Sequence, residues 1–241
     1  MDTPDGEPGR TERSMKMKQI VPTALVLGFL AQAQGTNAPY ASMAALDRYL
    51  IADRDAEIIL AKSAAPSAIS DNADVMVLER QGYKTAAKGT NGFVCMVERS
   101  WTAPFGDPEF WNPKIRGPIC FNPPAARTYL PITISRTQLA LAGKSEIQMR
   151  DAINSALDKR ELPALEAGAM CYMLSKQGYL GDRAGHFHPH LMFWVERTKL
   201  ESWGAGMAGS PIIGAEEIPG RLTIFIVPVG KWSDGTSDSH D

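Results

Sequence analysis

The order of helix-like and strand-like patterns restricts the fold of this chain more than any other feature. Residues 145–163 form the strongest helical pattern: Ser145 and Gln148 are spaced as a capping box, apolar residues recur at helical spacing, and Pro163 ends the run. Strand-like runs lie before it, at 74–78 and 92–101, and after it, at 168–174, 188–196 and 222–227. This order predicts an α+β fold: a single domain in residues 39–232, with an antiparallel or mixed sheet and helices packed on one face.

Several local expectations accompany this outline. The pattern of residues 42–62 predicts a helix that breaks near Asp53. Residues 137–142 are expected to form a short helix that ends at Gly143. The first two strands, separated by turn residues, suggest a meander. Residues 101–124 are rich in proline and aromatic residues, which favours a long loop held by its own buried side chains over an aromatic carbohydrate groove. Residues 233–241 are polar and are expected to be a disordered tail.

The N-terminal residues have the pattern of an export signal. A basic start, an apolar run from Ile20 to Leu30 and a small-x-small site at Ala31 and Ala33 predict a signal peptide over residues 15–33, with cleavage as late as residue 38. Residues 1–14 are polar and are interpreted as a mis-called N-terminal extension. The apolar run is too short to span a bilayer stably, so we expect a periplasmic or secreted protein with no stable membrane span after cleavage.

Export makes a disulfide plausible among the three cysteines, Cys95, Cys120 and Cys171. The favoured pair is Cys95–Cys120, which would close a loop of about 25 residues and stabilise the fold by about 3 kcal/mol. Cys171 would then be a buried free thiol. Pairings with Cys171, and three reduced cysteines, are the alternatives.

The formal net charge of −2 gives no sign of a polyanionic partner. We therefore expect neither a nucleic acid nor an anionic membrane surface as a partner. Whether the partner is a small molecule or a protein is left open by the composition.

Three of the four histidines, His186, His188 and His190, alternate within five residues. In an extended strand their imidazoles would project from one face at intervals of about 6.5–7 Å, so that two neighbours could share one ion. Met192 continues the same face and would suit copper, whereas Asp182, the nearest carboxylate, would suit zinc. The pattern predicts a transition-metal site that binds copper or zinc.

Two other functions compete with this metal-binding interpretation. In the first, the protein is an exported binding or structural module whose histidines only fix a loop. In the second, it is a hydrolase that depends on a metal or on a cysteine and a histidine, since Cys171 lies on the strand expected to pair with the histidine strand. Whether the protein is an enzyme is not decided by these residues.

Five segments taken together resemble a group of uncharacterised exported bacterial proteins with no assigned activity. They are GTNGFVC (89–95), FWNP (110–113), GPICFNPP (117–124), CYMLSKQGY (171–179) and GHFHPHLMF (185–193). The resemblance spans most of the chain after the signal-like segment. It implies export and a single domain, and it assigns no catalytic residue.

Overall fold

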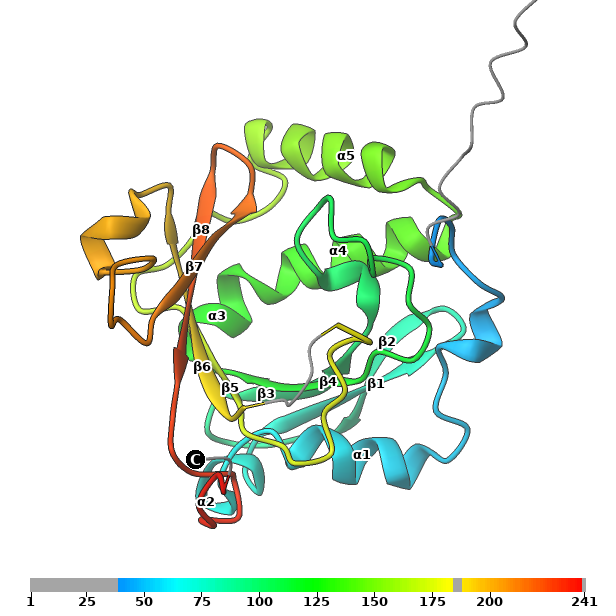
Figure 1. Ribbon diagram of the computed structural model, residues 1–241. Coiled ribbons are helices and arrows are strands. Elements are labelled where there is room, and N and C mark those ends of the chain that lie inside the picture. The colour runs from blue at the N-terminus through cyan, green and yellow to red at the C-terminus, as the bar shows by residue number, and fades with distance from the viewer. Residues whose placement is uncertain (1–38, 184–187, 240–241) are drawn as a thin grey trace, which may run out of the picture. The chain divides into compact units, whose positions relative to one another are not determined.

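The structure is a computed structural model that describes residues 39–183 and 188–239 (Figure 1). Its helices, in chain order, are the 3-10 turn η1 (Leu46–Arg48), α1 (Arg54–Lys62), α2 (Ser67–Ser70), η2 (Ser100–Thr102), α3 (Pro123–Thr128), α4 (Leu130–Leu141), α5 (Glu146–Asp158) and η3 (Leu200–Trp203). Its strands are β1 (Asp74–Glu79), β2 (Gly82–Ala87), β3 (Val94–Glu98), β4 (Gly117–Phe121), β5 (Met170–Met173), β6 (His190–Glu196), β7 (Ile213–Ile218) and β8 (Leu222–Pro228).

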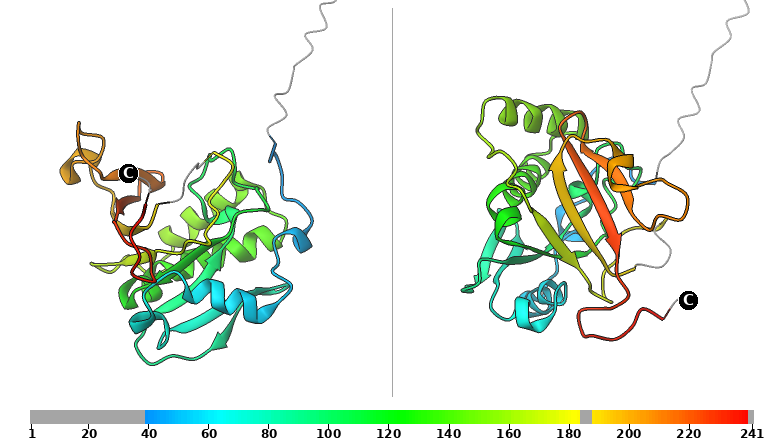
Figure 2. Two further views of the ribbon diagram at one scale, coloured as in Figure 1. Left: turned by 60° about the horizontal axis from the view of Figure 1, so that its bottom comes forward. Right: turned by 90° about the vertical axis from the view of Figure 1, so that its left-hand side faces the viewer.

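All eight strands form one mixed sheet in the order β2-β1-β3-β4-β5-β6-β8-β7. Every neighbouring pair is antiparallel except β1 and β3, which are parallel. The right-hand view of Figure 2 shows β6, β8 and β7 side by side. The predicted hairpin between residues 168–174 and 188–196 is present as β5 and β6, with Met173 opposite His190. The α+β class and the mixed sheet are therefore confirmed.

The expected meander is wrong, because β1 and β3 pair in parallel and an unexpected strand, β2, lies between them in the chain and pairs antiparallel with β1. The chain returns from β2 across the start of β1, and Gly89 lies at the crossing. Its backbone N–H donates to Asp74 Oδ1 at 2.7 Å, and an added Cβ would lie 2.1 Å from the carbonyl oxygen of Asn72. Only glycine fits so close an approach, and this long-range requirement cannot be distinguished from an ordinary turn glycine in the sequence.

The irregular segment expected at residues 101–124 contains strand β4 and leads directly into α3. Proline usually argues against a central strand because it lacks an N–H donor. Here β5 pairs only with Cys120 and Phe121, so Pro118 lies where β4 has one strand neighbour instead of two. The aromatic residues of the segment pack inward as expected, and Trp101 and Phe110 are almost completely buried.

Helices cover both faces of the sheet, in contrast to the expected single face. Helices α3 to α5 lie on one face, and α1 lies on the other (Figure 1). Strand β3 explains why, since Cys95, Met96 and Val97 are all fully buried and successive side chains point to opposite faces. Met96 belongs to the larger core cluster beneath α3 to α5, and Cys95 to a smaller cluster beneath α1.

The helix boundaries differ in part from those expected. Only residues 54–62 of the segment 42–62 are α-helical, because Asp53 caps α1 by accepting from the N–H groups of Asp55 and Ala56. Helix α4 ends before Gly143, as predicted, but starts at Leu130. The Ser145–Gln148 capping box of α5 is confirmed.

The last residues also differ from the disordered tail that we expected. Trp232 N–H donates to the carbonyl of Thr236, Lys231 forms a bridge with Ser237, and the Asp238 side chain contacts His188. These contacts order the chain as far as Asp238. Within residues 39–183 and 188–239, every helix is too short or too polar to cross a membrane.

Candidate functional site

The histidine segment does not form one continuous strand face. Strand β6 begins only at His190, whose buried ring donates from Nδ1 to the carbonyl of His188 at 2.8 Å. The His188 ring is about half exposed at 52%, and its Nδ1 lies 2.7 Å from Asp238 Oδ2. His186 lies outside the described residues. The two described imidazoles therefore have different surroundings, one buried and one at the surface.

The two additional ligands suggested by the sequence, Asp182 and Met192, have different surroundings. Asp182 accepts hydrogen bonds from Tyr40, Lys114 and Tyr179, and the lysine holds the pKa of this carboxyl well below its usual range. Met192 lies two positions after His190 on the buried face of β6. Among the described residues no three His, Cys, Asp or Glu side chains are grouped so that they could hold a metal ion. A copper or zinc site that includes His186 stays a prediction.

The cysteines follow the favoured partition of one disulfide and one thiol. Cys95 and Cys120 are bonded to each other as direct partners on β3 and β4. Cys171 is a buried free thiol on β5, and it lies opposite Phe121, one position from Cys120, so it belongs to the other face of the sheet. Burial raises the pKa of the Cys171 thiol well above its usual value, which argues against a nucleophilic role near neutral pH.

A cavity of about 260 Å³ lies on the α3 to α5 side of the sheet, at the inner face of β6. His190, Met192 and Trp194 all line it, so the alternation read from the sequence does place these three side chains on one face. The remaining lining is mainly apolar and comes from β3 to β5, β7, β8, the loops after β3 and β5, and Tyr129 between α3 and α4, with members such as Met173, Leu180, Ile224 and Ile226.

A carboxyl group faces this apolar cavity. Glu98, the last residue of β3, is part of the lining, and Thr133 Oγ1 donates to its Oε1 at 3.4 Å. Burial, and secondarily the negative charge of Glu217, raises the pKa of Glu98 to about 8. The group is therefore mostly a neutral carboxylic acid at pH 7, and can donate a hydrogen bond.

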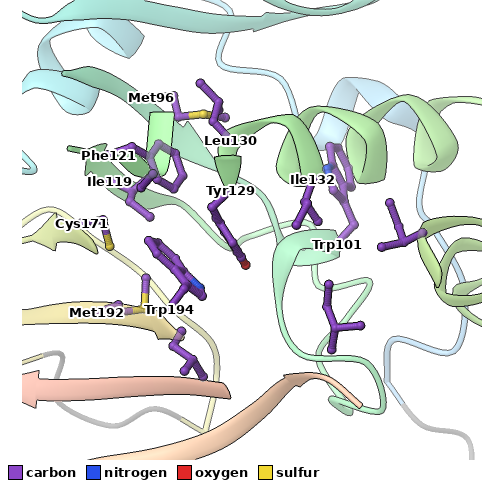
Figure 3. Packing of buried hydrophobic residues seen from close by; sticks show 14 of the residues in the cluster. Met96, Trp101, Ile119, Phe121, Tyr129, Leu130, Ile132, Cys171, Met192 and Trp194 are labelled. Carbon is purple, nitrogen blue, oxygen red and sulfur yellow. The ribbon is translucent and has the colours of Figure 1, made fainter. Parts of the chain in front are cut away.

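Two further polar atoms at the cavity have no hydrogen-bond partner. They are Trp194 Nε1 and Ser100 Oγ. Among the described residues, these two are the buried side-chain nitrogen and oxygen atoms that have no hydrogen-bond partner. Trp194 is 2% exposed and stacks on Tyr129 with ring centroids 3.9 Å apart. Figure 3 shows its indole nitrogen at the same end of the stacked pair as the Tyr129 hydroxyl. Burying an unpaired donor costs about 1–3 kcal/mol, so two at one cavity call for an explanation.

An ion pair beside the cavity holds the loop that covers it. Arg136 Nη1 of α4 lies 3.0 Å from Glu217 Oε1 of β7, which also accepts from the Tyr129 hydroxyl at 2.7 Å. Arg136 in addition donates to the carbonyls of Trp101 and Ala103. One buried guanidinium thus connects α4, β7 and the loop after β3.

His190 is neutral in this setting. Burial lowers the pKa of its imidazole below the ordinary value. Because Nδ1 donates to the His188 carbonyl, the neutral ring is the tautomer that carries its proton on Nδ1.

The cavity continues outward into a second, more polar hollow of about 300 Å³. The two share Ala103, Asp107, Ile115 and Leu180, and Arg183 lines only the outer one. Two larger hollows, of about 450 and 390 Å³, lie against α3 to α5. Neither is lined by an unpaired buried polar atom, so the cavity at Glu98 is the stronger candidate site.

Comparison with known proteins adds no relative: no family model, no curated protein and no solved structure matches the chain. The resemblance to exported bacterial proteins is neither supported nor contradicted by this result. The site is therefore defined by its geometry alone.

The sequence pattern indicated the β6 face of the cavity, including His190, but not the glutamates that line it. Glu98 ends an apolar strand, and Glu217 follows another glutamate in β7, which we did not expect as a strand. A single acidic residue at a strand end is usually solvated. Nothing local in the sequence shows that the loop after β3 folds back over Glu98.

Proposed function

We propose that the protein is an exported binding protein whose cavity at Glu98 takes a small, mainly apolar molecule with one polar group. The observation that carries the proposal is that two residues lining a mainly apolar cavity have unpartnered buried atoms, Trp194 Nε1 and Ser100 Oγ. A ligand with a polar group can supply the missing hydrogen-bond partners, whereas a purely structural cavity would leave the desolvation of these atoms uncompensated.

The size of the cavity limits its occupant. An engineered apolar cavity of about 150 Å³ holds a benzene molecule. A volume of about 260 Å³ is therefore suited to a molecule of one or two rings. The apolar lining supplies the affinity and the few polar groups supply orientation, as in other small-molecule sites.

Export is supported by the Cys95–Cys120 disulfide, because disulfides persist mainly in oxidising compartments. The signal-like pattern over residues 15–33 points the same way. Expression in a bacterial host followed by N-terminal sequencing of the periplasmic fraction tests this part. A mature start near Gln34 or Pro39 supports export, and an uncleaved cytoplasmic chain contradicts it.

Binding is tested by calorimetric titration with indane, an apolar bicyclic hydrocarbon, and with its ketone 1-indanone. Ala215 lines the cavity from β7, so Ala215→Phe fills part of it. Glu216→Phe is the matched control, since it adds the same ring to the exposed neighbouring residue of the same strand.

We expect both probes to bind the native protein and the control, and to bind Ala215→Phe at least about tenfold more weakly. Thermal melts verify that the variants are folded, and Ala215→Leu replaces Ala215→Phe if the larger ring unfolds the chain. The proposal is contradicted if neither probe binds the native protein. It is also contradicted if the probes bind Ala215→Phe as tightly as they bind the native protein.

A further inference from the structure

The unpaired atoms at the cavity specify the polar group of the ligand. An indole N–H can only donate a hydrogen bond, so the atom that faces Trp194 Nε1 has to be an acceptor. The Ser100 hydroxyl can donate to the same kind of atom. Glu98 is a third donor while its carboxyl group carries a proton, which its burial favours. An acceptor such as a carbonyl oxygen matches the hydrogen-bonding capacity of each of the three groups.

The charges around the cavity argue against an anionic ligand. Every arginine at the lining, or bound to it, already has a carboxylate partner: Arg99 pairs with Glu57 at 2.9 Å, and Arg136 with Glu217 at 3.0 Å. In the outer hollow Arg183 pairs with Asp107 and Glu109. An anion would lose its hydration without gaining a cation, and that cost is large in an apolar cavity.

A cationic ligand fits no better. The carboxylates of Glu217 and Asp107 are paired with Arg136 and Arg183, and the third carboxyl group of the lining, Glu98, is mostly protonated below its pKa of about 8 and offers little negative charge. A cation's own N–H donors would also face Trp194 Nε1, which needs an acceptor. The remaining class is an uncharged molecule.

We propose that the cavity selects an uncharged one- or two-ring molecule with a carbonyl-type acceptor, which receives hydrogen bonds from Trp194 Nε1 and Ser100 Oγ. This inference rests on the proposed binding function and adds the chemical class of the ligand. It requires no cofactor and no chemical change in the bound molecule.

Four probes with one bicyclic skeleton test the class: indane, 1-indanone, protonated 1-aminoindane and indane-1-carboxylate. Calorimetry at pH 6.5 measures their affinities for the native protein. We expect 1-indanone to bind about three- to tenfold more tightly than indane, which corresponds to one or two net hydrogen bonds between neutral groups. We expect the amine and the carboxylate to bind more weakly than indane.

The donor is identified by Trp194→Phe, which removes Nε1–H and keeps an aromatic ring against Tyr129. The ketone should lose its advantage in this variant, while indane keeps an affinity within about twofold of the native value. Trp203→Phe is the matched control, because Trp203 stacks on Phe225 and is not part of the cavity lining. Ser100→Ala provides a second, smaller change if Trp194→Phe disturbs packing.

The outcomes separate the two proposals. If indane binds as tightly as 1-indanone, or if neither Trp194→Phe nor Ser100→Ala reduces the advantage of the ketone, the cavity binds apolar molecules but the acceptor class is wrong. If the amine or the carboxylate binds most tightly, the uncharged class is wrong. If no probe binds, the binding function itself fails.

Discussion

At the scale of single residues, the cavity holds polar groups in states that water would not favour. Glu98 is protonated and two donors are unpaired at pH 7. Neither state follows from residue type. Both depend on burial that the folded chain provides.

Glu98 should make stability depend on pH. Its pKa is about 8 in the folded protein, against an ordinary value of 4.5, so the folded state holds a proton that the unfolded chain releases. The stability it contributes is complete below about pH 4.5 and is lost as pH rises to 8, by at most about 1.4 kcal/mol per pH unit. Glu98→Gln should therefore gain stability relative to the native protein between pH 5 and pH 8, as measured by urea unfolding.

Other titratable and polar groups near Glu98 also affect how the stability of the native protein depends on pH. The charge of Glu217 raises the pKa of Glu98 and that of Arg136 lowers it, while Thr102 and Thr133 form hydrogen bonds with it. The charge of Glu98 in turn raises the pKa values of Tyr83 and Cys171. Burial also raises the pKa of Glu217, so the native curve includes that group as well. The comparison of native protein with Glu98→Gln isolates the Glu98 contribution, and equal stability differences at both pH values contradict it.

Ser100→Ala should not destabilise the ligand-free protein. The Ser100 hydroxyl is buried without a partner, so its removal deletes no hydrogen bond and relieves a desolvation cost of about 1 kcal/mol. Thr137→Ala is a matched control, because the Thr137 hydroxyl accepts from Trp101 Nε1 at 3.0 Å and its loss leaves a buried donor unpaired. A loss of stability in Ser100→Ala as large as that in the control would show that the hydroxyl is paired.

The predicted copper or zinc site can also be tested at a single residue, His188. His188 is the only member of the cluster two positions from both His186 and His190, so a site built on i, i+2 spacing must use it. Protein purified without a histidine tag should contain stoichiometric metal, and His188→Ala should lose it. His240→Ala serves as the control histidine. Metal-free native protein with no melting shift on addition of copper or zinc would contradict the site.

At the scale of elements, local signals were readable and long-range pairings were not. The α5 capping box, the β5–β6 hairpin and β8 follow from patterns of a few residues. Strand β4 was hidden by Pro118, which is tolerated because β5 does not reach it. The parallel pairing of β1 with β3 depends on the crossing at Gly89, and no local pattern encodes it.

Gly89→Ala should destabilise the protein severely, because the added Cβ would overlap backbone atoms of Asn72 and Ala73. We expect a loss of about 2 kcal/mol or more, measured by chemical unfolding. Gly230→Ala is the matched control, since an added Cβ at Gly230 meets no atom within 4 Å. A change at Gly89 no larger than that at Gly230 would show that the crossing is not as close as described.

At the scale of the whole molecule, the sequence predicted the fold class and the disulfide but only part of the site. The cavity lining comes from strands β3 to β8, the loops after β3 and β5, and Tyr129, and Arg136 of α4 joins it through Glu217. A site assembled from so many elements has no sequence motif. The histidine pattern marked only the β6 contribution to it.

The buried disulfide has a kinetic consequence. Cys95 and Cys120 are fully buried, in a cluster with Ala61, Ala64 and Ala65 at the end of α1 and just after it. A reductant can reach the sulfur atoms only after this region opens, so the rate of reduction of the native protein measures how often that opening occurs. The rate should become independent of reductant concentration once reduction outpaces closing, and should rise when Asp53→Ala weakens the α1 cap. Ser145→Ala, which weakens the cap of the distant α5, should leave it unchanged.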